Sequence, residues 1–374
     1  MALKVALAAG GTAGHINPAL ALAEELKRRG HEVSFYGQPN RLEATLVPEA
    51  GFDFFPTRIS GFDRERPWTL ISAFVRMTKA ERAIGSHFQE TGVPDVAVGF
   101  GAYVEMPLLR WCSRHDVPVV VHEQNSVPGL ANKMCSGFAR TLCLSLPEAM
   151  PAFEGRLGKD TKVVVTGNPV RRSVISATRT DGRRAFGVPE DARMLLVFGG
   201  SLGAHHLNEA LCEMKDELLS RKDLYVVHST GKDDAEFVEK TLALTPEEKK
   251  RYQVKPYISN MGEALAAADC VISRAGASSI AEIAALAVPS LLIPYPKATA
   301  DHQTTNAHYL VDAGAAHLLP DAEVETERFR EEVLSLVDNA EERGAMRKAA
   351  EGLGQAHAAA ALADEVERAA RAKA

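Results

Sequence analysis

The first half of the chain alternates short apolar runs with longer segments of helical periodicity. The apolar runs lie at residues 5–9, 32–37, 95–101, 117–125 and 162–169. Those at 95–101 and 117–125 are continuous rather than alternating, which is typical of parallel strands that are buried on both faces. Between the first two runs, residues 18–28 have the spacing of an amphipathic helix, and Gly30 follows just past its end. This rhythm of strand and helix predicts a doubly wound α/β sheet.

The same pattern begins again near the middle of the chain. Residues 194–211 repeat the order of apolar strand, glycine-rich turn and helix with which the chain opens, so that GGTAG at 10–14 corresponds to GGSLG at 199–203. Further apolar runs follow at 223–230, 255–258, 269–276 and 289–296. We therefore expect two tandem Rossmann-like domains that face each other across a cleft. The first domain is expected at 1–168 and the second at 169–355, and a C-terminal helix at about 356–374 is expected to complete the first domain. Ligands are expected at the carboxyl ends of the strands.

Composition and charge narrow the class of protein. The chain has 374 residues, of which 46% are hydrophobic and 25% are charged, which predicts a soluble globular protein. Its formal net charge is −6, so nothing suggests a nucleic-acid partner. The five cysteines are scattered and form no C-x-x-C pair, which favours a reducing compartment and no structural zinc. The opening apolar run is expected to be a strand rather than a signal peptide, and no apolar stretch reaches the roughly 18 residues of a membrane span.

The two glycine-rich turns are the first candidate chemistry. Glycines between a strand and a helix let the backbone approach a ligand closely, and the helix N-terminus offers N–H groups with a partial positive charge. A phosphate or pyrophosphate is the expected ligand, and a turn that serves only packing is the alternative. Neither turn has the pattern G-x-G-x-x-G, and the strands that follow end in FYGQ and HST without an acid for a ribose. This argues against a dinucleotide oxidoreductase.

An acid that suits a ribose occurs further along the chain. Residues 270–286 predict a strand, a turn of small residues and a helix, with Glu282 in the second helical turn. Its carboxylate can accept hydrogen bonds from two vicinal hydroxyls. Ser278 or Ser279 is the expected N-cap of this helix, and the same amides can face a phosphate. The alternative is that Glu282 is a solvated residue or one that complements the helix dipole.

Six motifs occur in an order and spacing similar to those of a known family. They are GGTAGH (10–15), HEQN (122–125), GNPVR (167–171), GGSLGA (199–204), RAGASSIAE (274–282) and DHQTTNA (301–307). Over essentially its whole length the chain resembles the MurG family, bacterial transferases that add N-acetylglucosamine to lipid I to make lipid II. The resemblance implies the two-domain GT-B glycosyltransferase fold, no cofactor, and a peripheral location at the cytoplasmic face of the bacterial plasma membrane.

The resemblance implies that UDP-N-acetylglucosamine lies mostly on the second domain. Ser201 and Arg171 would contact its phosphates. The backbone of Ile258 would contact the uracil, and Gln303 would contact the sugar hydroxyls. The nucleotide would be held by Ala277, Ser278, Ser279, Ile280, Ala281 and, on the ribose, Glu282. No D-x-D pair occurs in the sequence, so no metal is implied, and a fixed cation with helix-end amides would stabilise the departing UDP.

The resemblance assigns the acceptor and the proton transfer to the first domain. The reaction inverts the anomeric carbon of the donor, and a sugar hydroxyl has a very high pKa, so a general base is expected. His15 is the leading candidate for this base, or for an acceptor-binding residue, because a helix N-terminus disfavours imidazolium. Glu123 is the rival base or an orienting residue, and a packing or capping role is the alternative for His15. The cleft and acceptor contacts would come from Thr12, Ala13, Gly14, Asn125 and Tyr103.

Four positions depart from the family pattern on the acceptor side. Ala13 stands where the family usually has glycine, and a required positive φ there would cost about 1 kcal/mol. Ala102 also replaces a glycine, and Glu105 and Met106 replace small residues. These departures bear on acceptor geometry and leave the donor site unaffected.

A segment at 61–84 combines apolar and basic residues and is the candidate membrane face. Its apolar residues are Trp68, Leu70, Ile71, Phe74 and Val75, and its bases are Arg64, Arg66, Arg76, Lys79 and Arg82. An apolar patch rimmed by bases suits an anionic bilayer, and the acceptor of the family is a polyprenyl lipid. We therefore expect peripheral contact with an anionic membrane surface through about 64–82. The alternative is a helix that buries this stripe within its own domain.

Three other functions are compatible with this pattern. A GT-B enzyme with a different acceptor, such as a diacylglycerol or secondary-metabolite glycosyltransferase, shares the fold, although HEQN and GNPVR together favour the lipid I enzyme. A sugar-nucleotide epimerase on the same plan would need carboxylates that converge on the donor sugar. A binding protein with an inactive site is the third. The leading prediction is the transfer of N-acetylglucosamine from UDP-N-acetylglucosamine to the C4 hydroxyl of the muramyl sugar of lipid I.

Overall fold

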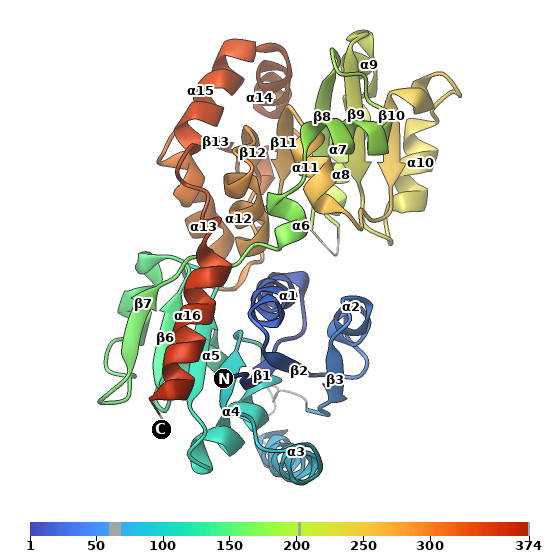
Figure 1. Ribbon diagram of the computed structural model, residues 1–374. Coiled ribbons are helices and arrows are strands. Elements are labelled where there is room, and N and C mark those ends of the chain that lie inside the picture. Colours follow the sequence, from blue (N-terminus) through green and yellow to red (C-terminus); the bar gives the residue numbers. More distant parts are fainter. Residues whose placement is uncertain (60–68, 201–202, 373–374) are drawn as a thin grey trace. The chain divides into compact units, whose positions relative to one another are not determined.

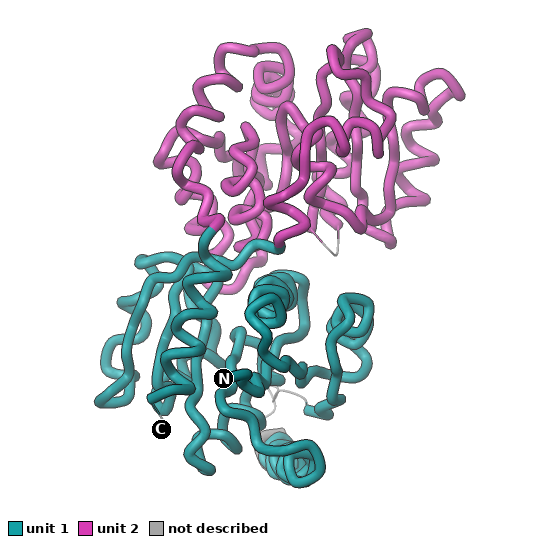
Figure 2. Tube along the Cα trace, in the orientation of Figure 1, with its two compact units in different colours: residues 1–171, 357–374 teal, residues 172–356 magenta. Residues whose placement is uncertain are grey.

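The computed structural model describes residues 1–59, 69–200 and 203–372, without the side chains of residues 69–72. The chain forms two compact units (Figures 1 and 2). Unit 1 consists of Met1–Arg171 and His357–Ala374, and unit 2 consists of Arg172–Ala356. Each unit is a parallel sheet with helices on both faces. The predicted fold class, two doubly wound α/β sheets in tandem, is confirmed.

Unit 1 contains a seven-stranded parallel sheet in the order β3-β2-β1-β4-β5-β6-β7. Its strands are β1 (Lys4–Ala8), β2 (Glu32–Gly37), β3 (Asp53–Pro56), β4 (Val96–Gly99), β5 (Val119–Glu123), β6 (Thr141–Leu144) and β7 (Lys162–Val165). Its helices are α1 (Ala13–Arg28), α2 (Glu43–Glu49), α3 (Thr69–Thr91), α4 (Glu105–Arg114), α5 (Leu130–Cys135) and α16 (Ala358–Arg371), with the 3-10 helix η1 (Pro147–Phe153). The strand order reverses between β1 and β4, and ligands of open sheets bind at such a switch point.

The helices of unit 1 cover both faces of its sheet. Successive residues of a strand point to opposite faces, so Val5 and Leu7 of β1 pack with α1 and α16, whereas Ala6 and Ala8 pack with α3 and α4. All four side chains are buried. Burial on both faces is the reason that the run is uniformly apolar.

The C-terminal helix α16 belongs to unit 1. It packs beside α1 and against β4, β5 and β6, and Figure 1 shows it in red. Leu362 and Val366 are its fully buried side chains on this face. Arg29, just after α1, forms ion pairs with Asp364 at 2.7 Å and with Glu367 at 3.1 Å. Charges as well as apolar packing therefore join the two ends of the chain within this unit.

Unit 2 contains a six-stranded parallel sheet in the order β10-β9-β8-β11-β12-β13. Its strands are β8 (Arg193–Phe198), β9 (Leu224–Ser229), β10 (Tyr252–Lys255), β11 (Cys270–Ser273), β12 (Ser290–Leu292) and β13 (Ala316–Leu318). Its helices are α6 (Arg172–Ile175), α7 (Arg179–Phe186), α8 (His205–Glu213), α9 (Lys215–Ser220), α10 (Ala235–Leu242), α11 (Met261–Ala267), α12 (Ala277–Ala285), α13 (His302–Val311), α14 (Glu327–Asp338) and α15 (Ala340–Ala350). Short 3-10 helices are η2 (Glu248–Lys250), η3 (Thr299–Asp301) and η4 (Asp321–Glu323).

Two predicted boundaries are wrong, and three strands were not predicted. The helix predicted at 18–28 begins at Ala13 and contains Pro18, so the glycine-rich turn enters the helix directly. The run predicted as a strand at 255–258 is mostly the loop after β10. The strands without a predicted counterpart are β3, β6 and β13, which have only four, four and three residues. In these three the apolar residues do not extend into a longer run, as they do around the equally short β4, β11 and β12.

Candidate functional site

The two glycine-rich turns lie at equivalent places in the two sheets. The first follows β1 and the second follows β8, and each of these strands borders the point at which the strand order reverses. Gly11 has a φ of +87° and Gly200 has a φ of +88°, a region of backbone conformation that favours glycine. The internal repeat in the sequence is therefore matched by the same backbone conformation at equivalent positions.

A buried carboxylate from α2 holds the first glycine-rich turn. Glu43 is 1% exposed, and it accepts hydrogen bonds from the N–H groups of Gly11 at 3.1 Å and Gln38 at 3.0 Å. A Cβ at Gly10 or at Gly37 would collide with this side chain, so both positions need glycine to make room for it. One amide of the turn that was expected to bind an anion therefore already donates to a carboxyl oxygen within the chain.

His15 lies in the first turn of α1. Its Nδ1 is 3.1 Å from Oγ1 of Thr12, the N-cap residue of the helix. The tautomer with its hydrogen on Nδ1 donates to Thr12 and leaves Nε2 with a lone pair, which is what a general base requires. A Cβ on Gly101 would lie 3.5 Å from Cδ2 of His15, so the loop after β4 packs against this ring.

The departure from the family pattern at Ala13 causes no backbone strain. Ala13 is the first residue of α1, and Gly14 follows it within the helix. Among the residues that the structure describes, positive φ outside glycine occurs at Asp116, Ala243, Ala287, Ala300 and Asp301. The cost expected for a positive φ at Ala13 therefore does not arise.

A second buried acid, Glu105, holds the loop that packs against His15. Glu105 begins α4 and is fully buried, and its Oε2 accepts a hydrogen bond from the N–H of Gly101 at 2.6 Å. Gly101 has a φ of +86°. Burial raises the pKa of Glu105 to about 8, against the effect of this hydrogen bond, and the nearby charge of Glu123 raises it further. The sequence marked Glu105 only as a departure from the family pattern.

A third buried acid, Glu123, ends β5 and organises the loop that follows. Its carboxylate accepts hydrogen bonds from the main-chain N–H groups of Asn125 at 2.9 Å and Gly129 at 3.2 Å. The side-chain amides of Asn125 and Asn132 donate to it as well, at 3.2 and 2.8 Å. Burial raises the pKa of Glu123, while these hydrogen bonds lower it. Because both oxygens serve donors of its own loop, the geometry favours the orienting role of Glu123 over the base role.

The HEQN and GNPVR motifs meet at the end of β5. Nε2 of His122 is 3.0 Å from the main-chain oxygen of Gly167, and its Nδ1 is 3.0 Å from Nε2 of Gln124. Burial lowers the pKa of His122 to about 4, so the ring is neutral. Gln124 therefore donates to Nδ1, and Nε2–H donates to Gly167. This pair of bonds anchors the GNPVR segment to the sheet of unit 1.

Two further predicted residues of unit 1 have partners within it. Arg171 donates from Nε and Nη2 to one carboxylate oxygen of Glu24 on α1, at 2.9 and 2.7 Å. To contact a phosphate, its guanidinium would have to bind the phosphate together with Glu24 or break its hydrogen bonds to Glu24. Tyr103 lies in the loop between β4 and α4, where it is half-buried and packs on the apolar core of that face. Their predicted ligand contacts stay predictions.

The second glycine-rich turn is held by α8. Asn208 donates from Nδ2 to the main-chain oxygen of Thr230 at 3.0 Å. Gly203 has a φ of +78°, and a Cβ there would collide with the same oxygen of Thr230. Ser201, the predicted phosphate contact, lies outside the described residues.

The RAGASSIAE and DHQTTNA motifs meet at the turn between β11 and α12. Oε1 of Gln303 accepts hydrogen bonds from the N–H groups of Ala275 at 3.1 Å and Tyr295 at 2.9 Å. Nδ2 of Asn306 donates to the main-chain oxygen of Ala275 at 3.4 Å. Since its oxygen serves this turn, Gln303 offers a ligand the two hydrogens of its amide nitrogen.

The predicted nucleotide-binding stretch, 277–282, forms the first turns of α12. Gly276 is the N-cap, so the prediction that Ser278 or Ser279 caps this helix is wrong, and both serines lie in its first turn. Glu282 is only 8% exposed, so it is not the solvated residue of the alternative interpretation.

Ile258 follows β10, and its side chain is buried in the core, which leaves its main chain as the group that suits the predicted contact with a base.

Several residues that support these loops were not among the predicted site residues. Glu43, Glu105 and Asn132 are described above, and Arg274 is another. Buried Arg274 forms an ion pair with Asp321 and donates to the main-chain oxygen of Ile293 at 3.2 Å. Arg274 lies inside a motif and Asn132 lies close after one, so proximity to a motif could have indicated both residues from the sequence. Glu43 lies in no motif, and only its contacts with two distant glycines reveal it.

Two features are absent from the described part of the chain. No helix within residues 1–59, 69–200 and 203–372 has the length and apolar character needed to cross a bilayer. In the same residues, no group of three or more His, Cys, Asp or Glu side chains is arranged to hold a metal ion.

The paired sheets with their two switch-point turns define a GT-B glycosyltransferase. The N-terminal domain of glycosyltransferase family 28 matches residues 5–143, and the C-terminal domain of the same family matches residues 194–366. The fold is also that of CalG4, the calicheamicin glycosyltransferase, whose crystal structure has a TM-score of 0.67 at 18% identity and covers 99% of this chain and 98% of that one.

The similarity to one group of these enzymes is much closer and extends over nearly the whole chain. A relative from Moorella thermoacetica is 38% identical over 96% of this chain and 97% of its own length, and one from Halothermothrix orenii is 34% identical over 94% and 95%. Both are named UDP-N-acetylglucosamine–N-acetylmuramyl-(pentapeptide) pyrophosphoryl-undecaprenol N-acetylglucosamine transferase. The crystal structure of Acinetobacter baumannii MurG is 28% identical, with a TM-score of 0.70 over 98% of this chain and 99% of that one. The chain belongs to the MurG family within glycosyltransferase family 28.

Proposed function

We propose that the protein transfers N-acetylglucosamine from UDP-N-acetylglucosamine to the C4 hydroxyl of the muramyl sugar in undecaprenyl-diphospho-N-acetylmuramyl-pentapeptide, lipid I. The product is lipid II, which is used for peptidoglycan synthesis. The observation that carries this proposal is the similarity, over at least 94% of the chain, to transferases named for this reaction.

The reaction is a displacement at the anomeric carbon of the donor sugar. The acceptor oxygen forms the new bond to this carbon, the bond to UDP breaks with its electron pair going to the diphosphate, and the hydroxyl proton passes to a base. Attack from the face opposite UDP converts the α linkage of the donor to a β linkage. His15 is the base in this proposal, because Nε2 can take the proton while Nδ1–H donates to Thr12, 3.1 Å away.

Unit 2 supplies the donor site in this proposal except for Arg171, which belongs to unit 1. The first turns of α12 hold the nucleotide, with Glu282 on the ribose, and Gln303 donates from its amide nitrogen to a sugar hydroxyl. Ser201 and Arg171 contact the phosphates, and the main chain of Ile258 contacts the uracil. Helix-end amides and a fixed cation stabilise the departing diphosphate without a metal ion.

We propose further that unit 1 works on an anionic membrane surface at the cytoplasmic face of the bilayer. Phe74 and Val75 on α3 are 64% and 46% exposed, and a polyprenyl acceptor lies in the bilayer. Other residues of the predicted face lie outside the described residues or have no described side chain: Arg64, Arg66, Trp68, Leu70 and Ile71. Replacing Phe74 and Val75 by serine should weaken partitioning onto anionic vesicles. Val93→Ser, at a valine 49% exposed after α3, is the control, and unchanged partitioning of the double variant would contradict the proposal.

The direct test of the transferase activity uses the purified protein, UDP-N-acetylglucosamine and a short-chain lipid I analogue. Transfer is expected, and it should continue when a chelator is added. Transfer to a different acceptor but not to the lipid I analogue would favour another GT-B enzyme. Transfer only with added metal would contradict the metal-free donor site.

A further inference from the structure

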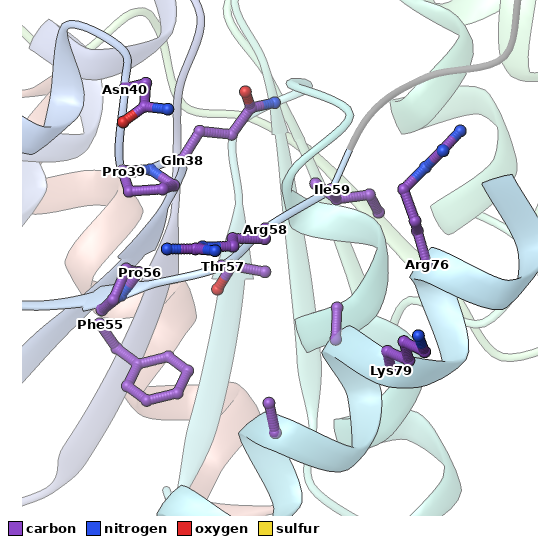
Figure 3. A pocket seen from close by; sticks show the side chains of 12 residues that line it. Gln38, Pro39, Asn40, Phe55, Pro56, Thr57, Arg58, Ile59, Arg76 and Lys79 are labelled. Carbon is purple, nitrogen blue, oxygen red and sulfur yellow. The ribbon is translucent and has the colours of Figure 1, made fainter. Parts of the chain in front are cut away.

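Unit 1 contains a cavity of about 660 Å³ beyond the carboxyl ends of β2 and β3. Figure 3 shows its walls: the loop after β2, the segment after β3, and one face of α3. Arg76 and Lys79 rise from α3 on one side, and Gln38 and Asn40 lie on the loop opposite. The described residues that line the cavity all belong to unit 1.

The charged side chains among the described residues that line the cavity are all positive. Arg58, Arg76 and Lys79 line it, and among its described lining residues none is acidic. Neither Arg58 nor Lys79 forms an ion pair with another described residue. Cations without a carboxylate partner in a concave site raise the local concentration of anions, and the amides of Gln38 and Asn40 add hydrogen-bond donors. The chemistry of the walls suits an oxyanion.

The cavity adjoins the first glycine-rich turn. Gln38, whose side chain lines the cavity, donates its N–H to Glu43 at 3.0 Å, and the same carboxylate accepts the N–H of Gly11 at 3.1 Å. His15 follows four residues after Gly11. Because Glu43 already occupies the amide of Gly11, the first turn is a poor place for an anion of the acceptor, whereas the adjacent cavity presents cations.

We infer that this cavity binds an anionic group of the acceptor. The inference rests on the proposed function: the names of the curated relatives specify an acceptor with a pentapeptide, whose carboxylates are anionic, and a pyrophosphate. Both groups present oxygens that guanidinium and ammonium groups bind by charge-assisted hydrogen bonds. With the acceptor sugar at His15 and its charged arm in the cavity, Arg58 and Lys79 determine how tightly the acceptor binds and take no part in the chemical step.

The test is the double variant Arg58→Gln/Lys79→Gln of the full chain. Its control is Lys159→Gln, which removes an exposed cation of unit 1 that does not line the cavity. With a water-soluble lipid I analogue, the KM for the acceptor should rise about tenfold or more in the double variant, as expected for the loss of charge-assisted hydrogen bonds. The kcat and the KM for UDP-N-acetylglucosamine should stay unchanged, and Lys159→Gln should behave as the wild type. An unchanged acceptor KM, or an equal rise in Lys159→Gln, would overturn the inference.

A second acceptor, in which the peptide carboxylates are carboxamides, identifies the bound group. If the defect of the double variant disappears with this acceptor, the cavity binds a peptide carboxylate. If the defect persists, the cavity binds the pyrophosphate. Calorimetry without the donor measures the binding of both analogues even if no transfer occurs. It therefore tests whether the cavity binds the acceptor independently of whether the protein has the proposed transferase activity. Equal affinities of wild type and double variant, with weaker partitioning of the variant onto anionic vesicles, would overturn the inference and assign these cations to the membrane surface.

Discussion

Glu105 should make the stability of unit 1 fall as the pH rises, and Glu105→Gln should remove that dependence. The carboxyl group is fully buried, and its only hydrogen bond from the main chain among those described comes from Gly101 at 2.6 Å. Glutamine keeps the volume of the side chain and an oxygen that can accept this bond, but it cannot ionise. The substitution therefore isolates the ionisation of Glu105 from its packing.

The magnitude follows from the difference between the two pKa values. Burial raises the pKa of Glu105 from 4.5 to about 8 in the folded protein. Between these values the unfolded chain has lost the proton and the folded chain keeps it, so the free energy of unfolding falls as the pH rises. Each pH unit in this interval is worth about 1.4 kcal/mol. The free energy of unfolding of the wild type should fall by roughly 2 kcal/mol between pH 6 and 7.5 relative to that of Glu105→Gln.

Urea unfolding followed by tryptophan fluorescence measures this effect in unit 1 specifically. The chain has two tryptophans, Trp68 and Trp111, and both positions fall in unit 1. Glu49→Gln, at an exposed carboxylate that ends α2, is the control and should keep the wild-type pH dependence. Equal pH dependence in the wild type and Glu105→Gln would show that Glu105 does not titrate in this interval and would refute the argument.

Three further substitutions test the loops on both units. His15→Ala should lower kcat by roughly 10²- to 10⁴-fold with little change in the KM for UDP-N-acetylglucosamine, and a normal kcat in steady-state kinetics would transfer the base role elsewhere. Glu43→Ala leaves the buried N–H groups of Gly11 and Gln38 without their acceptor, so it should lower the free energy of unfolding in urea by about 2 to 5 kcal/mol. Gln303→Ala should raise the KM for UDP-N-acetylglucosamine about tenfold while the acceptor KM stays constant, and a change confined to the acceptor KM would contradict its assignment to the donor site.

The strands of both sheets were largely predictable because parallel strands are buried on both faces. The run at 32–37 coincides with β2, and the core of the run at 269–276 is β11. The start of α1 was not predictable in the same way, since Pro18 suggests a helix N-terminus but lies inside the helix. The three strands that were not predicted, β3, β6 and β13, are defined by their neighbours in the sheet, and that information is absent from a local window of sequence.

The turns of the candidate site could be located from the sequence where they lie in motifs, whereas their supports could not. Glycine and small residues mark the close turns between strand and helix, and the resemblance supplied the roles of the residues there, whose ligand contacts stay predictions. Glu43 and Glu105 support these loops from positions in which a charged residue usually indicates a solvated helix face. Glu43 meets the N–H of Gly11, 32 residues away in the sequence. Glu105 fills the space beside Gly99 at the end of β4 and accepts a hydrogen bond from Gly101 in the loop after it. Only the folded chain brings these groups together.

The two units hold their loops with different chemistry, and this difference bears on which substrate each one binds. In unit 1, three buried acids accept hydrogen bonds from main-chain N–H groups of the loops after β1, β4 and β5. These acids are Glu43, Glu105 and Glu123. In unit 2, the neutral side chain of Gln303 accepts hydrogen bonds from main-chain N–H groups of the turns after β11 and β12. Glu105, whose pKa burial raises to about 8, keeps its proton at neutral pH. Where a loop acid of this kind is ionised, its negative charge repels a diphosphate in front of the loop, whereas a neutral amide does not. The nucleotide diphosphate therefore suits the edge of unit 2, and an uncharged acceptor hydroxyl suits the edge of unit 1. An anionic acceptor then needs cations placed to one side of the acidic loops, and Arg58 and Lys79 in the cavity of unit 1 meet that requirement.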